Sequence, residues 1–207
     1  MNFLSIKKAY LTNIDQVLEF GSWVQDENLK RTKEILQLST TIHFSNAPCG
    51  ETVKDIIWNG EILDKYCEQL LDPNDKGFVY DYGNRLRGCD VDQIEYVIDK
   101  LHTCSTSRRA IAVTWRPALD THQEDVPCMV LLDFKVRNQN LYITGYWRSW
   151  DIYGASYANM KGVECIGRYI CKRLGLRLKQ LHILASSAHI YETDIKQAEQ
   201  LLKANGG

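Results

Sequence analysis

The middle of the sequence carries apolar residues in the patterns of β-strands. Residues 34–44 alternate apolar and polar positions, as a half-buried strand does. Residues 128–136 contain a continuous apolar run, which is typical of a largely buried strand. The polar turn Asn138-Gln139-Asn140 follows, and residues 141–147 resume a strand pattern, so a hairpin is predicted here. Further strands are predicted at residues 109–115 and 178–185.

Apolar residues recur at helical spacing on both sides of this region. Residues 52–71 show this spacing up to Asp72-Pro73-Asn74, where proline and asparagine close a helix. Residues 159–174 show it up to Gly175. Helices are also predicted at residues 91–101 and 191–202, whereas residues 10–24 fit either a helix or a strand. Strands in the middle with helices before and after predict an α+β fold, in one domain spanning residues 1–207.

Composition excludes several classes of protein. Of the 207 residues, 44% are hydrophobic and 25% are charged, and the net charge is −1. A nearly neutral net charge argues against a protein that coats nucleic acid, because binding along a phosphate backbone needs a basic surface. It leaves room for a local basic pocket that binds one phosphate. No apolar run is as long as the roughly 18 residues of a membrane span, so no membrane association is expected. Two lysines near the N-terminus are not followed by an apolar core, so no secretory signal is expected and the expected location is cytoplasmic.

Seven cysteines occur without a CxxC pair or a regular spacing, which indicates reduced thiols. Each is by default a small buried apolar residue. The cations Arg108, Arg109 and Arg148 lie beside apolar strands, where uncompensated charge is costly, and a shared phosphate would resolve that cost. The same cations would lower the pKa of a nearby Cys128 thiol. The residues alone therefore indicate a phosphate-bearing substrate and a cysteine nucleophile, without naming the reaction.

Five segments occur in an order that resembles the thymidylate synthase family, and within it the short archaeal branch. They are Tyr82-Gly-Asn-Arg-Leu-Arg, Ser107-Arg-Arg-Ala-Ile-Ala-Val-Thr-Trp, Val126-Pro-Cys-Met, Arg148-Ser-Trp-Asp with Asn159 eight residues after the aspartate, and Ser187-Ala-His-Ile-Tyr. The resemblance covers about half of the chain, residues 82–191. It implies a three-layer α/β/α-type sandwich whose mixed sheet forms the interface of a homodimer.

The resemblance implies which residues hold the nucleotide phosphate. Arg108 and Arg109 match a pair that crosses the dimer interface to the phosphate of the partner's nucleotide. Arg148 and Ser149 match the arginine and serine that bind phosphate within the subunit. Arg31, followed by Thr32 and Lys33, is the expected counterpart of an early Arg-Thr-Gly loop.

The resemblance also makes Cys128 the nucleophile that adds to C6 of a pyrimidine. Asn159 matches the asparagine that reads the base, and an amide that donates to O4 and accepts from N3–H favours uracil. His189 and Tyr191 match contacts to the sugar hydroxyl, and Tyr82 matches a tyrosine of the catalytic site.

The pterin side of the site is expected to include Asp151, which matches a carboxylate that binds the pterin ring, and Trp150 beside it. The general acid/base carboxylate is expected at Asp55 in Asp55-Ile-Ile-Trp58, with Glu51 and Glu61 as alternatives. The chain stops soon after the last predicted helix, without the tail that closes over folate in bacterial and eukaryotic members. The expected co-substrate is therefore methylene-tetrahydrofolate or a methylene-tetrahydromethanopterin-type pterin.

Three functions remain open from the sequence. The favoured one is reductive methylation of deoxyuridylate (dUMP) to thymidylate (dTMP) by a methyltransferase of the thymidylate synthase type. The alternative is a hydroxymethylase acting on dCMP, CMP or dUMP, in which water captures the one-carbon unit; Trp147 and Trp150 beside Arg148 could reshape the pterin pocket accordingly. A third is a non-catalytic nucleotide-binding homodimer, in which Cys128 would react no faster than a buried thiol.

Overall fold

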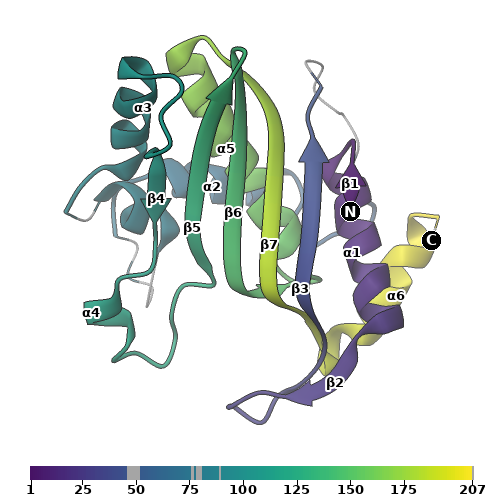
Figure 1. Ribbon diagram of the computed structural model, residues 1–207. Coiled ribbons are helices and arrows are strands. Elements are labelled where there is room, and N and C mark those ends of the chain that lie inside the picture. The colour runs from purple at the N-terminus through teal and green to yellow at the C-terminus, as the bar shows by residue number, and fades with distance from the viewer. Residues whose placement is uncertain (46–51, 76, 78–80, 89, 207) are drawn as a thin grey trace.

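A seven-stranded mixed β-sheet with helices on one face organises the chain (Figure 1). The computed structural model describes residues 1–45, 52–75, 77, 81–88 and 90–206. The strands are β1 (Asn2–Phe3), β2 (Ser22–Gln25), β3 (Arg31–His43), β4 (Ile111–Val113), β5 (Met129–Arg137), β6 (Asn140–Asp151) and β7 (Arg177–Tyr191). The helices are α1 (Ile6–Phe20), α2 (Gly60–Leu71), α3 (Gln93–Thr103), α4 (Pro117–Asp120), α5 (Ser156–Leu174) and α6 (Ile195–Ala204), with a π-helical turn η1 (Asn84–Gly88) and a 3-10 turn η2 (Glu192–Asp194).

The strand order brings four strand ends to one edge of the sheet. The order is β1-β3-β7-β6-β5-β4, with β2 paired to β3. Strands β6 and β7 run parallel and are connected by α5, so both end at the same edge. Because β5 and β3 run antiparallel to β6 and β7, they begin at that edge. Cys128, Arg148, His189 and Arg31 come from these four ends, although they are far apart in sequence.

One face of the sheet is the core. Ala112, Leu132, Gly145 and Ile183 form one cross-strand row over β4, β5, β6 and β7, and all four are buried. Helix α5 packs closely on this face, because a Cβ at Gly167 would lie 2.7 Å from Ile143 and 2.9 Å from Leu178. Helix α1 covers β3 and β7 on the same face, and α6 packs against α1. The packed helices thus shield this face of the sheet from solvent.

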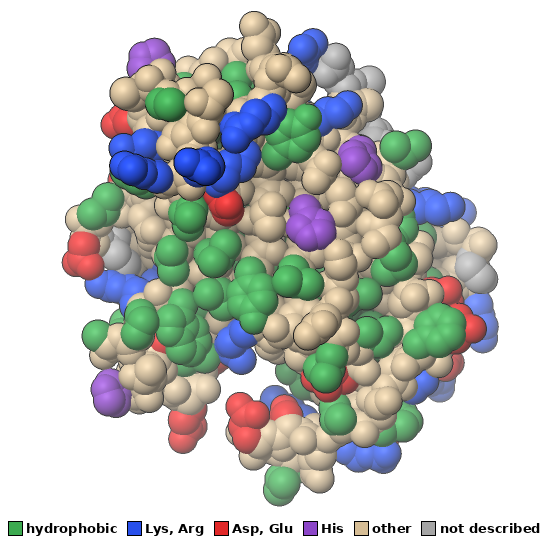
Figure 2. All heavy atoms as spheres, in the orientation of Figure 1, with side chains coloured by type: hydrophobic (Ala, Val, Ile, Leu, Met, Phe, Trp, Pro, Cys, Tyr) green, Lys and Arg blue, Asp and Glu red, His purple; other side chains and the backbone are tan. Residues whose placement is uncertain are grey.

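The opposite face of the sheet is open and carries an apolar row of its own. Val113, Leu131, Tyr146 and Leu184 are cross-strand neighbours on this face. Val113 and Leu184 at the two ends of the row are 38% and 37% exposed. Figure 2 looks onto this face and shows apolar side chains gathered over the middle of the sheet. In the described part of the chain the architecture therefore has two layers, the sheet and the helices on one of its faces.

The α+β class and the mixed sheet are confirmed, as are the predicted strands in the middle of the chain and the helices at residues 91–101 and 159–174. The hairpin turn is also confirmed, with positive φ at Asn138 (50°) and Gln139 (59°). The open choice for residues 10–24 resolves into the end of α1 followed by β2.

Two helix predictions extended too far. Residues 52–58 are not helical, since Asp55 has a φ of 59° and Gly60 a φ of 40°, and the helix starts only at Gly60. The last helix starts at Ile195 rather than 191, because β7 runs on to Tyr191 beside β3. No helix among the described residues is long and apolar enough to cross a membrane.

Candidate active site

Cys128 lies immediately before β5, under the side chain of Arg148 from β6. The Arg148 Nη2 atom is 3.9 Å from the Cys128 Sγ atom. The same guanidinium donates to the carbonyl oxygens of Val126 (2.7 Å) and Pro127 (3.0 Å), so it also fixes the segment that leads to the cysteine. A guanidinium at this distance favours the thiolate over the thiol. The predicted pairing of a cysteine with a cation is therefore present inside one chain.

Tyr82 supports the cysteine from the other side of the strand. Its hydroxyl oxygen accepts a hydrogen bond of 3.0 Å from the backbone N–H of Met129, the residue after Cys128. The register of β5 against β6 shifts between Met129 and Leu131. Bulges of this kind re-aim side chains next to active sites. The half-buried Cys128 is thus held by one residue on each side.

Asn159 lies in the first turns of α5 and its amide has two side-chain partners. The Trp150 Nε1–H donates to Asn159 Oδ1 over 3.2 Å, and Asn159 Nδ2 donates to the Tyr66 hydroxyl over 2.7 Å. Tyr66 comes from α2, and burial raises its pKa well above the ordinary value, with a further contribution from Tyr82 nearby. The sequence pattern placed Tyr66 only among the apolar positions of a helix, so its link to Asn159 was missed.

Asp151 and His189 are cross-strand neighbours at the ends of β6 and β7. Burial raises the pKa of the Asp151 carboxyl, while the Gly154 N–H, 2.9 Å from Oδ1, acts in the opposite direction. Burial lowers the pKa of His189, against the opposing charges of Asp151 and Glu34. A Cβ at Gly154 would lie 2.3 Å from the carboxylate, so only glycine allows this close approach. Burial thus shifts the pKa of each group toward its uncharged form.

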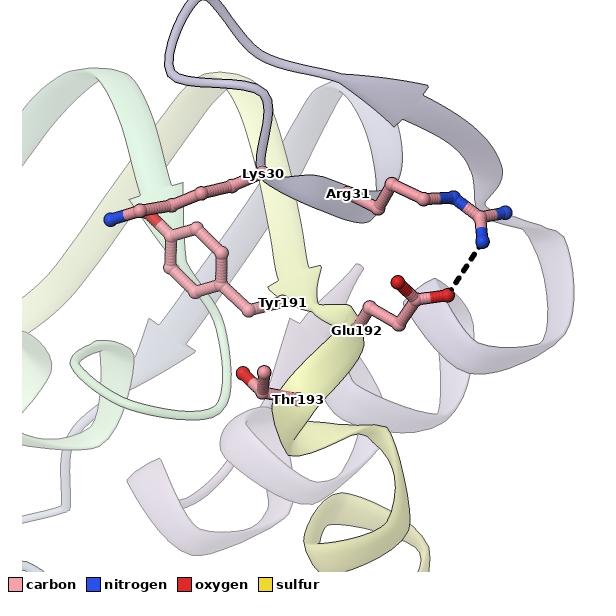
Figure 3. A pocket seen from close by; sticks show the side chains of 5 residues that line it. All are labelled: Lys30, Arg31, Tyr191, Glu192 and Thr193. Carbon is pink, nitrogen blue, oxygen red and sulfur yellow. Dashed lines mark hydrogen bonds and ion pairs between the residues drawn. The ribbon is translucent and has the colours of Figure 1, made fainter.

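A hollow of about 340 Å³ lies where the start of β3 meets the end of β7, and it is lined by Lys30, Arg31, Tyr191, Glu192 and Thr193 (Figure 3). Tyr191 lines it beneath Lys30, whose Nζ lies 5.7 Å from the ring centroid. Burial raises the pKa of Tyr191, and the nearby charges of Asp151 and Asp26 add to this effect. The Tyr191 ring lies edge-on to the His189 ring, with centroids 5.1 Å apart. Arg31 is at the rim and pairs with Glu192 over 2.7 Å. The structure therefore brings Arg31 and Tyr191 to the same end of the sheet as Cys128, and adds Lys30, which sequence reasoning did not single out.

Arg108 and Arg109 lie elsewhere in the same chain. The backbone N–H of Phe134 donates to the Ala110 carbonyl, so this pair of arginines precedes a point six residues along β5 from Cys128. At the usual strand rise this separation is about 20 Å, beyond the reach of an arginine side chain. Figure 1 shows β4 as a short strand beside β5, and the register places its first residue, Ile111, opposite Asp133 in the middle of β5. Arg108 and Arg109 are exposed and do not share an anion with Arg148 of the same chain. Their expected role at the partner's nucleotide stays a prediction.

The candidate acid/base residues differ in how the structure holds them. Asp55 is exposed in the loop before α2, whose Trp58 ring packs edge-on against Tyr66 at 5.3 Å. Trp58 also donates to the carbonyl of Gly154 over 2.5 Å, so the loop is tied to the Asp151 turn. Glu61 is exposed on α2 and pairs with Lys65. Glu51 lies outside the described residues.

Comparison with known proteins decides the family. The family model described as thymidylate synthase matches residues 52–206. A relative from Methanothermobacter marburgensis is 38% identical over 96% of this chain and 95% of its own length, and one from Methanococcoides burtonii is 38% identical over 96% and 92%. A relative from Methanocaldococcus jannaschii is 33% identical over 90% and 88%. All three carry the name thymidylate synthase provisionally.

The chain belongs to the thymidylate synthase family. The resemblance drawn from the five motifs is therefore confirmed, and the relatives also span the N-terminal segment, which those motifs left out. The residues beside His189 include a carboxylate from a neighbouring strand. Ser187, two residues before His189, donates from its hydroxyl to Glu34 on β3, and Glu34 is the cross-strand neighbour of His189. A carboxylate is thus supplied next to His189 from another strand.

Proposed function

We propose that this protein is a thymidylate synthase that methylates C5 of deoxyuridylate, with a methylene-tetrahydropterin as the one-carbon donor. The observation that carries the proposal is the joint position of Cys128 and Asn159. The thiol lies 3.9 Å from the Arg148 guanidinium, and Tyr82 accepts a hydrogen bond from the backbone of the next residue, Met129. Asn159 donates to Tyr66, and Tyr82 contributes to the raised pKa of that tyrosine. This end of the sheet offers a nucleophile, a base-reading amide and a cation for phosphate.

In this proposal the Cys128 thiolate adds to C6 of uracil and the electron pair moves to C5. The C5 carbon then attacks the methylene group carried by the pterin. Loss of the C5 proton releases the pterin amine, and hydride from the reduced pterin ring converts the methylene into a methyl group. The Cys128 sulfur leaves C6 at the end, so the thiol is regenerated and the pterin departs oxidised by two electrons. The Arg148 charge favours the thiolate at the start and its return at the end.

The residues proposed to bind the nucleotide lie at the same end of the sheet as Cys128. Arg148 and Ser149 are proposed to hold the phosphate, with Arg31 from the start of β3, and His189 and Tyr191 to contact the sugar. Asp151 is proposed to hydrogen-bond the pterin ring and Asp55 to relay protons. Both Asp55 and Glu61 are exposed. Asp55 is favoured because Trp58 ties its loop to the Asp151 turn, while Glu61 is paired with Lys65.

A homodimer is part of the proposal. The apolar row on the open face has no covering helix in the described chain, and Arg108 and Arg109 are exposed about 20 Å from their own Cys128. Pairing through the open face would bury the row and let these arginines serve the partner's nucleotide. Mixing Cys128→Ser with Arg109→Ala, each inactive alone, should restore part of the activity, because a mixed dimer has one intact site. A mixture that stays inactive after the subunits have exchanged would contradict a site shared between two subunits.

The experiment that tests the function measures tritium released from C5 of labelled deoxyuridylate. Methylene-tetrahydrofolate and a methylene-tetrahydromethanopterin are supplied in separate reactions. The proposal is supported if tritium release requires one of the two pterins and the product carries a methyl group in place of the C5 hydrogen. A product carrying one further oxygen would instead establish a hydroxymethylase. Absence of release with both pterins, from protein that is folded, would overturn the proposal.

A further inference from the structure

The Asn159 amide is held in one of its two possible orientations. Its two ends, oxygen and nitrogen, differ only in whether they accept or donate a hydrogen bond. The Trp150 indole nitrogen is a donor and has no acceptor capacity, so the atom 3.2 Å from it must be the amide oxygen. The amide nitrogen then faces Tyr66, 2.7 Å from the hydroxyl. Rotation of the amide by 180° would place an N–H against the indole N–H.

The two partners of the amide do not constrain it equally. A tyrosine hydroxyl both donates and accepts, so Tyr66 can turn its proton to suit either amide orientation. The indole N–H of Trp150 has no such freedom. Trp150 is also immobilised, because it is 1% exposed and packs against Trp147 with ring centroids 5.8 Å apart. The orientation of the amide is therefore determined by Trp150.

A fixed amide presents its remaining groups in a fixed order. The Asn159 oxygen keeps a second lone pair and the nitrogen keeps a second hydrogen. Uracil offers a donor at N3 and an acceptor at O4, whereas cytosine offers an acceptor at N3 and a donor at the 4-amino group. An amide that forms both hydrogen bonds to uracil must therefore rotate by 180° to form both hydrogen bonds to cytosine. Under the proposed function the observed orientation is the one that reads uracil. Reading cytosine would then require the rotated amide, which sets two donors, Asn159 Nδ2 and Trp150 Nε1, against each other.

We infer that Trp150 is a specificity-determining positioning residue, whose indole N–H locks the Asn159 amide in the orientation that reads uracil and rejects cytosine. This inference rests on the proposed function, in which Asn159 contacts the base. It gives Trp150 a role separate from the expected pterin contact, which stays a prediction.

The chain offers a matched control for the indole N–H. Trp147 is as buried as Trp150, at 1% exposure, and packs against it. Its Nε1 atom has no hydrogen-bond partner among the described residues. Trp147→Phe and Trp150→Phe therefore remove the same group from the same buried pair, and only the second removes a hydrogen bond to Asn159.

The experiment measures the affinities of deoxyuridylate and deoxycytidylate by titration calorimetry, without pterin. In Trp150→Phe the preference for deoxyuridylate should fall by about tenfold or more, since a buried donor no longer opposes the rotated amide. Trp147→Phe should keep the wild-type preference. Tyr66→Phe should weaken the binding of both nucleotides and leave their ratio unchanged. Replacing Trp150 by 3-benzothienylalanine, which keeps the bicyclic shape and lacks only the N–H, should reproduce the Trp150→Phe result in a fully packed core.

The outcomes separate this inference from the proposed function. Wild-type protein that binds neither nucleotide overturns the proposed function and the inference with it. Wild-type protein that prefers deoxyuridylate, with an unchanged preference in both replacements of Trp150, overturns the inference alone. An equal loss of preference in Trp147→Phe also overturns it, because the effect would then come from packing.

Discussion

The buried ion pair between Arg85 and Asp120 ties down the segment that carries Tyr82. Arg85 lies in η1 and makes two bonds to the carboxylate, with Nη2 2.8 Å from Oδ1 and Nη1 3.0 Å from Oδ2. It also donates to the Thr114 carbonyl, and Asp120 accepts from the Arg116 N–H. The two side chains are 6% and 1% exposed. Replacing Asp120 by asparagine keeps the shape and leaves a guanidinium buried without its counter-charge.

The expected cost follows from that burial. Breaking a buried pair by removing one partner costs about 3–5 kcal/mol. For a chain of this size one kcal/mol moves the melting temperature by roughly 2–4 °C, so Asp120→Asn should lower it by roughly 6–20 °C. Lys65→Gln is the matched control, because Lys65 and Glu61 are 2.7 Å apart but 71% and 81% exposed. An exposed pair of this kind contributes about 0.5 kcal/mol or less.

The effect of Asp120 also has a defined dependence on pH. Burial alone would raise the pKa of the Asp120 carboxyl, but the hydrogen bonds from Arg85 and from the Arg116 N–H outweigh it and hold the pKa below the ordinary value of 3.8. A carboxyl with a depressed pKa in the folded state stabilises the fold above the unfolded pKa and loses that contribution as the pH falls through the folded pKa. Urea unfolding at pH 7 and at pH 3 or below tests this. The reasoning would be refuted if Asp120→Asn lowered the free energy of unfolding at pH 7 no more than Lys65→Gln does. It would also be refuted if the difference in free energy of unfolding between wild type and Asp120→Asn did not become smaller in acid.

Three further predictions concern other parts of the molecule. Asp151→Asn should stabilise the fold at pH 7 while lowering activity, because burial raises the pKa of the Asp151 carboxyl and its ionisation therefore opposes folding above pH 3.8. Thermal melts and tritium release measure the two effects, and an Asp151→Asn protein that melts at a lower temperature would contradict this reasoning. Asn205→Ala removes two hydrogen bonds between the Asn205 side chain and the Lys54 backbone, 3.0 and 3.1 Å long. Because Asp55 follows Lys54 and would be held less firmly, the rate of tritium release should fall by about 10- to 100-fold. Gln139→Gly should stabilise the hairpin by about 1 kcal/mol, because φ at this position is 59°, and a loss of stability would contradict that account.

Sequence patterns predicted the central strands and the longer helices because burial imposes a period of two on a strand and of 3.6 on a helix. The hairpin and α5 follow this rule, including the stop at Gly175, whose φ is 67°. The segment 52–58 does not, because its apolar residues pack from a loop with a left-handed Asp55. Periodicity records which residues are buried and carries no information on the backbone angles of a short loop.

The site could be predicted only as a set of separate motifs. Cys128 and Arg148 are 20 residues apart in sequence, and their contact depends on the pairing of β5 with β6. Charge alone also grouped Arg108 and Arg109 with Arg148, although strand register separates them. Tyr66 gave no signal, because a tyrosine at an apolar position of a helix is ordinary until a buried partner appears. Register and hydrogen-bond partners are properties of the folded chain, which the residue pattern does not contain.

The central claim is that Cys128 forms a covalent bond to a pyrimidine nucleotide during one-carbon transfer. The direct measurement is the intact mass of protein incubated with 5-fluoro-deoxyuridylate and each pterin. Fluorine replaces the C5 hydrogen that must be lost as a proton, so the reaction stops at that step and the ternary adduct persists. A Cys104→Ser background removes an exposed thiol whose pKa is lowered by the Thr106 hydroxyl. The account predicts a mass increase equal to nucleotide plus pterin, located on the peptide that contains Cys128. An unchanged mass with both pterins, or an adduct on any other cysteine, would contradict it.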